Sequence, residues 1–258
     1  NTNDSLVTTS LVGDQLTLSY VAGQTGSADI TVRVTDIEGE WVEDTFTVTV
    51  EAVVEVVGRH VFYNNSAWDT VSDDNAIAPG KTALMPGQTA TVANYTNYSR
   101  GINGIMVDID GLSAAPVAAD FAIRVNSGDN PDVWTDGPAP TVDVRLGEGD
   151  GGSDRVTLVW ADGAIANQWV EITVLETGDT FYFGNAAGEA DGDGDIDADD
   201  YAALIGEFGQ SGGIGTLSAD FNADGRVSLA DFVVVRGRMG SEVQMPTVSA
   251  PAPLVPAS

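Results

Sequence analysis

The sequence predicts a mainly β chain that ends in a small helical unit. Two observations lead to this prediction. From residue 1 to about residue 185, short apolar runs alternate with polar residues at a period of two, which is typical of half-buried strands. Two later segments, 31 residues apart, instead place their apolar residues at helical spacing directly after a strongly acidic loop.

The first predicted domain spans residues 1 to 52 and consists of antiparallel strands. In each of three runs every second residue is apolar, and these residues share one face of the strand. The three faces consist of Leu16, Leu18 and Tyr20; Ile30, Val32 and Val34; and Phe46, Val48 and Val50. The stretch GSADITVRVTDIEGEWVEDTFTVTV resembles the last strands of cadherin-like and related immunoglobulin-like repeats of bacterial surface proteins. We expect a partial immunoglobulin-like sandwich, because a complete one needs about 100 residues.

A partial sandwich leaves an unpaired strand edge and an uncovered apolar face. Three explanations remain open at this point. The chain was cut from a longer protein, the half-sandwich packs on the next domain, or a strand of another molecule completes it.

The second predicted domain spans residues 53 to 185 and is a jelly-roll-like β-sandwich. Its expected strands, about eight in number, lie in the runs RHVFYNN, QTATVANY, GIMVDI, DFAIRV, TVDVRL, RVTLVW, VEITVL and DTFYFGN. Trp68 and Trp134 fall in loop-like sequence and are candidates for a carbohydrate site, since tryptophan rings stack on sugars. Packing over the end of the sandwich explains both residues equally well.

Composition excludes several classes of function. With 39 acidic residues against 10 basic ones, the formal charge of -29 repels nucleic acid and favours divalent cations. The chain has no cysteine, and its one lysine and one histidine leave few general bases. We therefore expect no catalytic residues and no enzymatic activity. No apolar run reaches the roughly 18 to 20 residues that a membrane span needs.

Two acidic segments form an internal repeat. EADGDGDIDADDYAALIGEFG begins at residue 189 and DFNADGRVSLADFVVVRGRMG begins at residue 220. In each, oxygen donors occupy positions 1, 3, 5, 9 and 12 of a 12-residue loop, with glycine at position 6 and an aliphatic residue at position 8. This is the spacing of an EF-hand calcium loop, in which position 7 contributes its main-chain carbonyl.

The repeat therefore predicts two calcium ions. The expected ligands are Glu189, Asp191, Asp193, Asp195, Asp197 and Asp200 in the first loop, and Asp220, Asn222, Asp224, Arg226, Ser228 and Asp231 in the second. Asp195 and Arg226 are expected to act through the main chain. The aliphatic residues at position 8, Ile196 and Val227, are expected to turn inward, where they can pair the two loops.

After each loop a helix begins, and no helix precedes the first loop. This arrangement, with Asp at position 12, resembles the dockerin type I module over residues 189 to 240. The resemblance implies that two calcium ions fold the module and that one face of its helices docks onto a cohesin domain. A calcium-stapled cap without a partner is the alternative.

The resemblance also implies which residues contact the partner. Recognition positions 10 and 11, often a Ser-Thr pair in that family, are here Ala198, Asp199, Leu229 and Ala230. This departure leaves calcium binding intact but argues against an ordinary cohesin partner. Glu189 also replaces the usual aspartate at position 1, and its additional methylene is expected to loosen the first site.

Residues 241 to 258 are rich in proline and alanine and are expected to form an extended tail. Together these features predict a non-catalytic, calcium-binding protein that is secreted or lies on a bacterial cell surface. Its partner is expected to be a cohesin-like protein or a second copy of the chain, joined by strand addition into a filament. In a further alternative the chain is the C-terminal accessory region of a secreted polysaccharide-degrading enzyme and binds polysaccharide.

Overall fold

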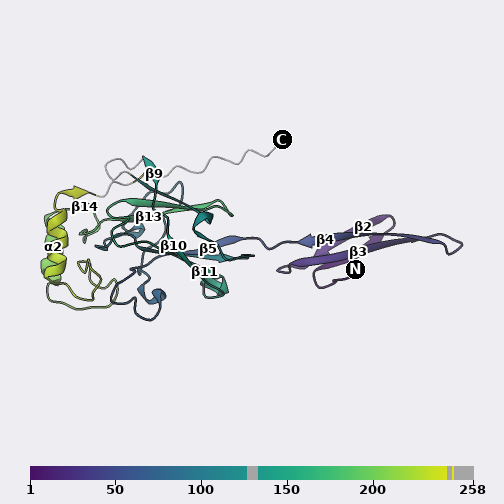
Figure 1. Cartoon of the computed structure of the whole chain (residues 1–258), viewed down its shortest axis with the longest axis horizontal. Helices are drawn as coiled ribbons and strands as arrows, with labels where there is room; N and C mark the ends of the chain where they lie inside the picture. The colour runs from purple at the N-terminus through teal and green to yellow at the C-terminus, as the bar shows by residue number, and fades with distance from the viewer. Residues whose placement is uncertain (127–132, 243–245, 247–258) are drawn as a thin grey trace. The chain divides into compact units, whose positions relative to one another are not determined.

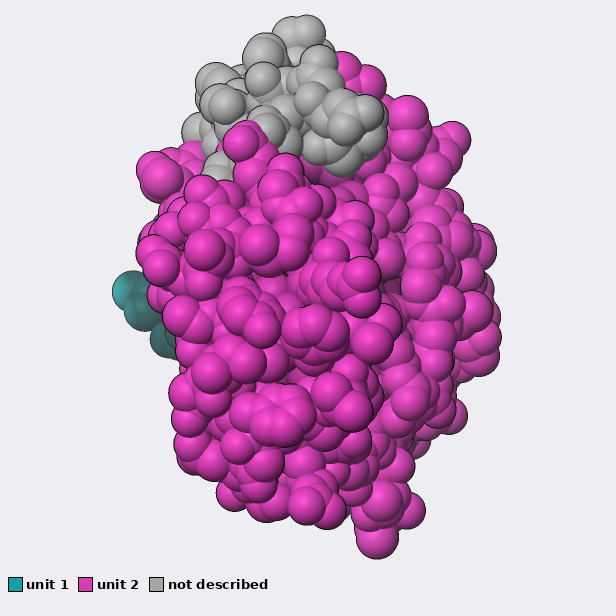
Figure 2. All heavy atoms as spheres, turned by 90° about the vertical axis from the view of Figure 1, so that its left-hand side faces the viewer, with its two compact units in different colours: residues 1–54, 111–113 teal, residues 55–110, 114–258 magenta. Residues whose placement is uncertain are grey.

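A computed structural model describes residues 1–126, 133–242 and 246 (Figure 1). Its contacts divide the chain into two compact units, which Figure 2 colours separately. Unit 1 comprises residues 1–54 and 111–113, and unit 2 comprises the remainder. The prediction of a mainly β chain with helices near its C-terminal end is confirmed. In the described residues, no helix is both long enough and apolar enough to cross a membrane.

Unit 1 consists of two antiparallel hairpins, each a two-stranded sheet. Their strands are β1 (Val7–Val12) with β2 (Gln15–Tyr20), and β3 (Gly26–Thr35) with β4 (Trp41–Val50). Strand β1 is not predicted by the sequence pattern, because its run VTTSLV carries too few apolar residues for a clear alternation.

The core of unit 1 occupies only one end of the β3–β4 hairpin. Leu6, Val7, Ala28 and Ile30 are buried there, and side chains of β2 and β4 pack against them. At the far end of the hairpin the apolar side chains are exposed, and Val34 retains 64% of its accessible surface. The alternating faces expected from the sequence are therefore buried at one end only.

Unit 2 contains a four-stranded and a five-stranded sheet. The four-stranded sheet, in the order β10-β11-β7-β5, consists of β5 (Glu55–Val61), β7 (Gly104–Asp110), β10 (Thr141–Arg145) and β11 (Asp154–Val159). The five-stranded sheet, in the order β6-β13-β12-β8-β9, consists of β6 (Tyr95–Thr96), β8 (Phe121–Asn126), β9 (Trp134–Asp136), β12 (Trp169–Val174) and β13 (Asp179–Asn185). All pairings are antiparallel except that of β6 with β13.

The predicted period-two alternation gives the core of these two sheets. Its buried side chains include Ile105, Val107, Val156, Leu158, Ile123, Val125, Val170, Ile172, Phe181 and Phe183. One expected strand is wrong: in QTATVANY, Val92–Asn94 forms a 3-10 turn, and only the following Tyr95–Thr96 pairs as a strand. The turn forms because the Asn94 side chain accepts a hydrogen bond from the Thr91 amide at 2.9 Å.

Two helices, α1 (Ala198–Glu207) and α2 (Leu229–Arg238), pack against each other at one end of unit 2 (Figure 1). Tyr201 and Phe232 meet edge to face, with 5.9 Å between ring centroids. Beneath them lies a small core of Ile196, Leu204, Ala219, Phe221, Val227 and Val235. A short sheet of β14 (Asp195–Ile196) and β15 (Ser241–Glu242) connects the first loop to the end of the described chain. Apart from Ser241, Glu242 and Pro246, the predicted tail lies outside the described residues.

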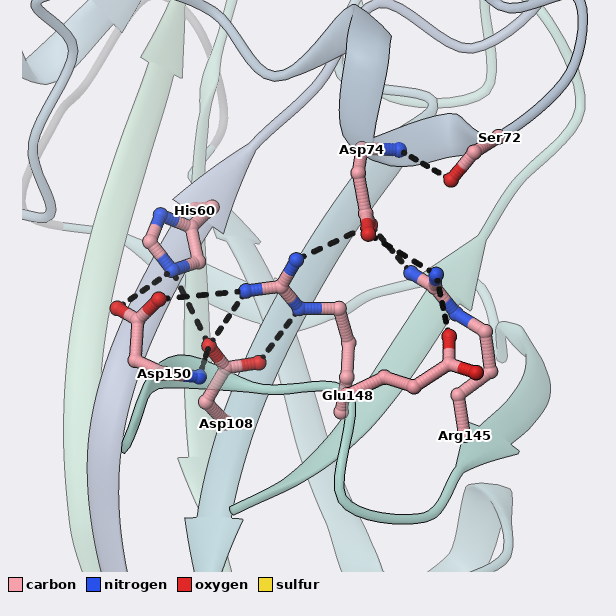
Figure 3. A network of polar contacts seen from close by, with 8 residues as sticks. His60, Ser72, Asp74, Asp108, Arg145, Glu148 and Asp150 are labelled. Atoms are coloured by element: carbon pink, nitrogen blue, oxygen red, sulfur yellow. Dashed lines mark hydrogen bonds and ion pairs between the residues drawn. The ribbon is translucent and has the colours of Figure 1, made fainter. Parts of the chain in front are cut away.

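A buried ion pair joins strands of the four-stranded sheet (Figure 3). The Asp108 carboxylate is fully buried and accepts hydrogen bonds from Arg155 Nε at 2.8 Å and Arg155 Nη2 at 2.7 Å. His60 Nε2 lies 3.3 Å from the same carboxylate, and the Asp150 amide donates to it at 2.9 Å. Burial alone raises the pKa of Asp108, but these hydrogen bonds outweigh burial and hold the pKa well below its usual range.

The same network has a defined pH dependence. Because the pKa of Asp108 is lower in the folded than in the unfolded chain, the ion pair stabilises unit 2 fully above pH about 4. That contribution is lost as the pH falls toward the folded-state pKa. The second side of Arg155 faces Asp74 at 3.0 Å, so one guanidinium serves two carboxylates.

We predict that Arg155→Met lowers the free energy of unfolding of unit 2 by about 3 to 5 kcal/mol, because it leaves Asp108 buried without its cation. Urea denaturation followed by tryptophan fluorescence measures this loss. The signal reports mainly on unit 2, because only Trp41 of the five tryptophans lies in unit 1. The matched control is Arg124→Met, which removes the more exposed pair with Glu171 and is expected to cost about 1 kcal/mol or less. Equal losses in the two variants would contradict the prediction.

Candidate metal centre

The first acidic loop runs from Glu189, which follows β13, to Asp200 in the first turn of α1. The structure gathers its carboxylates into two groups: Glu189, Asp191 and Asp193; and Asp195, Asp197 and Asp200. Within each group, one oxygen from each residue lies within 4.8 Å of the others. The side chain of Asp195 therefore lies among the expected ligands, whereas the loop spacing predicts only a main-chain role for this residue.

Backbone amides hold these side chains in place. The Asp193 amide donates to Asp191 Oδ1 at 3.2 Å, and the Asp195 amide donates to Asp193 Oδ1 at 3.0 Å. Asp200 is fully buried and accepts from the amides of Ala190 at 2.5 Å and Asp197 at 2.8 Å. The aspartate at position 12 thus closes the loop and, in the same contact with Asp197, caps α1.

The second loop repeats this arrangement. Asp231 is fully buried and accepts from the amides of Asn222 at 3.2 Å and Ser228 at 3.0 Å, as Asp200 accepts from the matching amides of Asp191 and Asp197. Asp220 accepts from the amides of Asp224 at 3.1 Å and Gly225 at 2.9 Å. The 31-residue repeat read from the sequence therefore extends to the hydrogen bonds that position 12 accepts, whereas the carboxylates at position 1 accept from different groups in the two loops.

Glycine at position 6 is required in both loops. Gly194 and Gly225 have φ of +97° and +87°, a region that residues with a Cβ atom rarely adopt. In the first loop this glycine separates the two carboxylate groups: Glu189, Asp191 and Asp193 precede it, and Asp195, Asp197 and Asp200 follow it.

The carboxylates of both loops repel one another. Burial, reinforced by the charges of Asp231 and Asp224, raises the pKa of Asp220 to about 6. Burial likewise raises the pKa of Glu189, and nearby Asp200 and Asp191 add to the effect. Without a cation, each loop therefore has a tendency to retain protons that a bound ion would displace.

The donor set suits calcium. The predicted ligands offer carboxylate, amide, hydroxyl and main-chain carbonyl oxygens, which hard cations of this size prefer. Carboxylates dominate the first loop, whereas Asn222 and Ser228 make the second loop less negative. The residues present therefore fit calcium in both loops.

The residues at position 8 only partly meet expectation. Ile196 and Val227 are buried and point into the helical core, as predicted. The backbones of the two loops do not pair through them in the described residues. Ile196 pairs with Ser241, and the Val227 amide donates to the Gln210 carbonyl at 3.1 Å, because the segments flanking the loops take these edge positions.

Residues 187–240 match the family model of the dockerin type I domain. The resemblance inferred from the two loops is thereby confirmed for this segment, which we call the dockerin. Type I dockerins in general bind calcium and dock onto a protein partner, the cohesin. No curated protein and no solved structure matches the chain.

The residues expected to contact a partner lie on the surface of the dockerin. Ala198 and Asp199 occupy the first turn of α1, Leu229 and Ala230 occupy the first turn of α2, and each of them retains accessible surface. They lie beside the loop ends that the buried aspartates close. Their role in docking stays a prediction.

The two candidate sugar-binding tryptophans are each half-buried. Trp68 packs against a cluster that contains Phe62 and Met106. The ring of Trp134 lies 5.4 Å from that of Tyr182, centroid to centroid. A carbohydrate role for either residue stays a prediction.

Two residues at the site were not predicted. Tyr95 donates its hydroxyl hydrogen to Glu189 Oε2 at 2.5 Å, and Asn97 Nδ2 donates to the Glu189 carbonyl at 2.9 Å. Both belong to the sandwich, more than 90 residues before the loop. No local signal in the run NYTNYS indicates a contact with a calcium loop.

We predict that the calcium-free chain becomes less stable as the pH rises from about 4 to 6. The pKa of Asp220 is about 6 in the folded chain and about 4 in the unfolded chain. Between these two pH values the folded chain holds this proton more tightly than the unfolded chain does, so raising the pH destabilises the folded state. Thermal unfolding midpoints of protein stripped of calcium measure the effect, and saturating calcium is expected to abolish it. Asp220→Asn should flatten the decline. A midpoint that rises between pH 4 and 6 in the unmodified calcium-free chain would contradict the prediction.

Proposed function

We propose that this chain is a non-catalytic, calcium-binding protein of the bacterial cell surface or extracellular matrix, and that its dockerin attaches it to a partner protein. The dockerin match over residues 187–240 carries the proposal. The oxygen-rich geometry of both loops supports one calcium ion in each.

The helices of the dockerin offer a surface for the partner. Figure 2 views unit 2 from the side on which α2 lies in Figure 1. Leu229 and Val233, one turn apart on α2, retain 70% and 67% of their accessible surface, and Ile205 of α1 is also exposed. Exposed apolar side chains on adjacent helices are typical of protein interfaces.

The backbone hydrogen bonds between the sandwich and the dockerin do not involve this surface in the part of the chain that the structure describes. They reach Phe221 and Ala223 in the second loop. Leu229 takes a position that is often polar in the family, which favours a cohesin-like partner with an apolar counterpart at this point. The proposed partner is therefore a cohesin-like domain of altered specificity.

Self-association through unit 1 is a second candidate function. The exposed apolar end of the β3–β4 hairpin, which includes Val34 and Val42, favours strand addition by another molecule. Residues 243–245 and 247–258, which would supply the donor strand, lie outside the described residues. The accessory role beside a polysaccharide-degrading enzyme would rest on Trp68 and Trp134, which are half-buried by packing, and it stays a prediction.

We predict that the full chain binds two calcium ions and that Asp231→Ala binds one. Asp231 closes the second loop through two backbone amides, so its loss removes both a ligand and the shape of the loop. Isothermal titration calorimetry measures the stoichiometry. Asp199→Ala, an exposed aspartate outside the ligand set, is the matched control and should retain two ions. Two ions in the Asp231→Ala variant would contradict the assignment.

We predict that Leu229→Asp weakens binding to a cohesin-like partner at least tenfold, because it places a charge in an apolar contact. The partner is found by screening a panel of cohesin domains in calcium, and affinities are measured by surface plasmon resonance. Val34→Asp, a similarly exposed substitution in unit 1, is expected to leave the affinity unchanged. Binding that persists after Leu229→Asp would place the contact elsewhere.

A further inference from the structure

The first calcium loop is built against the sandwich. Glu189, at its position 1, retains only 2% of its accessible surface. Its Oε2 accepts the Tyr95 hydroxyl hydrogen at 2.5 Å, and its Oε1 accepts from the Gly192 amide at 2.6 Å. One hydrogen bond comes from within the loop and the other from a strand of the sandwich, so the two parts together fix this carboxylate.

The position of Tyr95 is itself tightly determined. Its ring is buried and meets Trp169 edge to face, with 6.4 Å between centroids. Tyr95 pairs with Gly184 of β13, where a Cβ atom would lie 2.8 Å from the Cβ of Tyr95 and 2.8 Å from the Trp169 ring. The missing side chain at Gly184 lets the tyrosine approach, and β13 then leads directly into the loop.

Further hydrogen bonds hold the dockerin on the sandwich. Asn97 Nδ2 donates to the carbonyl oxygens of Glu189 at 2.9 Å and Ser218 at 2.7 Å. The amides of Ser99 and Ala67 donate to the carbonyls of Phe221 at 2.7 Å and Ala223 at 3.0 Å. Both loops therefore lie against the sandwich.

The two loops differ at position 1. In the second loop this position is Asp220, whose carboxylate receives its hydrogen bonds from the amides of Asp224 and Gly225. Both donors belong to the same loop. The hydrogen bond from the sandwich to the position 1 carboxylate is therefore a feature of the first loop.

The longer side chain at position 1 of the first loop explains why this carboxylate needs an additional hydrogen bond. A glutamate has one more rotatable bond than the aspartate at the matching Asp220, and ordering it for a metal costs more conformational entropy. A carboxylate oxygen has two lone pairs, so Oε2 can accept the hydroxyl hydrogen and still face a cation. The tyrosine thus orders the longer side chain before any ion binds.

We propose that Tyr95 is a positioning residue of the first calcium site, so that the sandwich sets the calcium affinity of that loop. The proposal rests on calcium binding by the dockerin. By thermodynamic linkage the coupling is reciprocal, and an ion in the first loop stabilises the sandwich in return. The second loop, whose position 1 is an aspartate held within its own loop, does not depend on Tyr95.

Calcium titration calorimetry of the full chain tests this proposal. Tyr95→Phe keeps the buried ring and removes only the hydroxyl group. In the Asp231→Ala background, which leaves the first loop to titrate alone, it should weaken calcium binding about tenfold, the loss typical of a hydrogen bond to a charged group. Tyr98→Phe is the matched control, since Tyr98 is equally buried but donates to the Asn64 carbonyl at 3.0 Å and should leave the affinity unchanged.

A second variant separates positioning from general stability. Glu189→Asp shortens the side chain out of reach of the hydroxyl, so adding Tyr95→Phe to it should change the calcium affinity by less than twofold. If Tyr95→Phe weakens binding equally with and without the Glu189→Asp substitution, the proposal is overturned. The proposal is also overturned if the chain binds two calcium ions and the Tyr95→Phe substitution leaves the calcium affinity unchanged. An unmodified chain that binds no calcium would overturn the proposed function and, with it, this inference.

Discussion

The repulsion among carboxylates in the two dockerin loops is the constraint on which this end of the chain depends. Amide groups relieve part of it: buried Asp200 and Asp231 each accept two or more backbone hydrogen bonds and cap the following helix. The helices rest on a core of only a few apolar side chains. With so small a core, the calcium binding proposed above would be coupled to the folding of the dockerin.

A buried carboxylate in the sandwich is stabilised in a different way. Asp108 has a fixed cation, the Arg155 guanidinium, within 2.7 Å, and that cation is covalently part of the protein. Under the proposed function, the dockerin carboxylates would instead take their cation from solution. The charge balance of the Asp108–Arg155 pair would then be independent of the calcium concentration, whereas that of the dockerin would follow it.

Local patterns predicted much of this structure, and non-local contacts account for what they missed. The two acidic loops and both helices follow from spacing within a dozen residues, and most sandwich strands follow from a period of two. The strand β9 was missed because three residues are too short to show a period, and QTATVANY was misassigned because a side-chain cap at Asn94 outweighed its alternation. The contact of Tyr95 with Glu189 spans 94 residues, a separation at which no periodicity carries information.

The backbone hydrogen bonds from Ser99 and Ala67 to the second loop have a mechanical consequence. A module joined only by a linker would let a docked protein swivel freely. Here the hydrogen bonds hold the dockerin in one orientation on the sandwich. A protein docked on α1 and α2 would therefore have a fixed orientation relative to the sheets of unit 2. Force applied to that protein would pass into the sandwich through the second loop, and the calcium ion proposed for this loop would stiffen the connection.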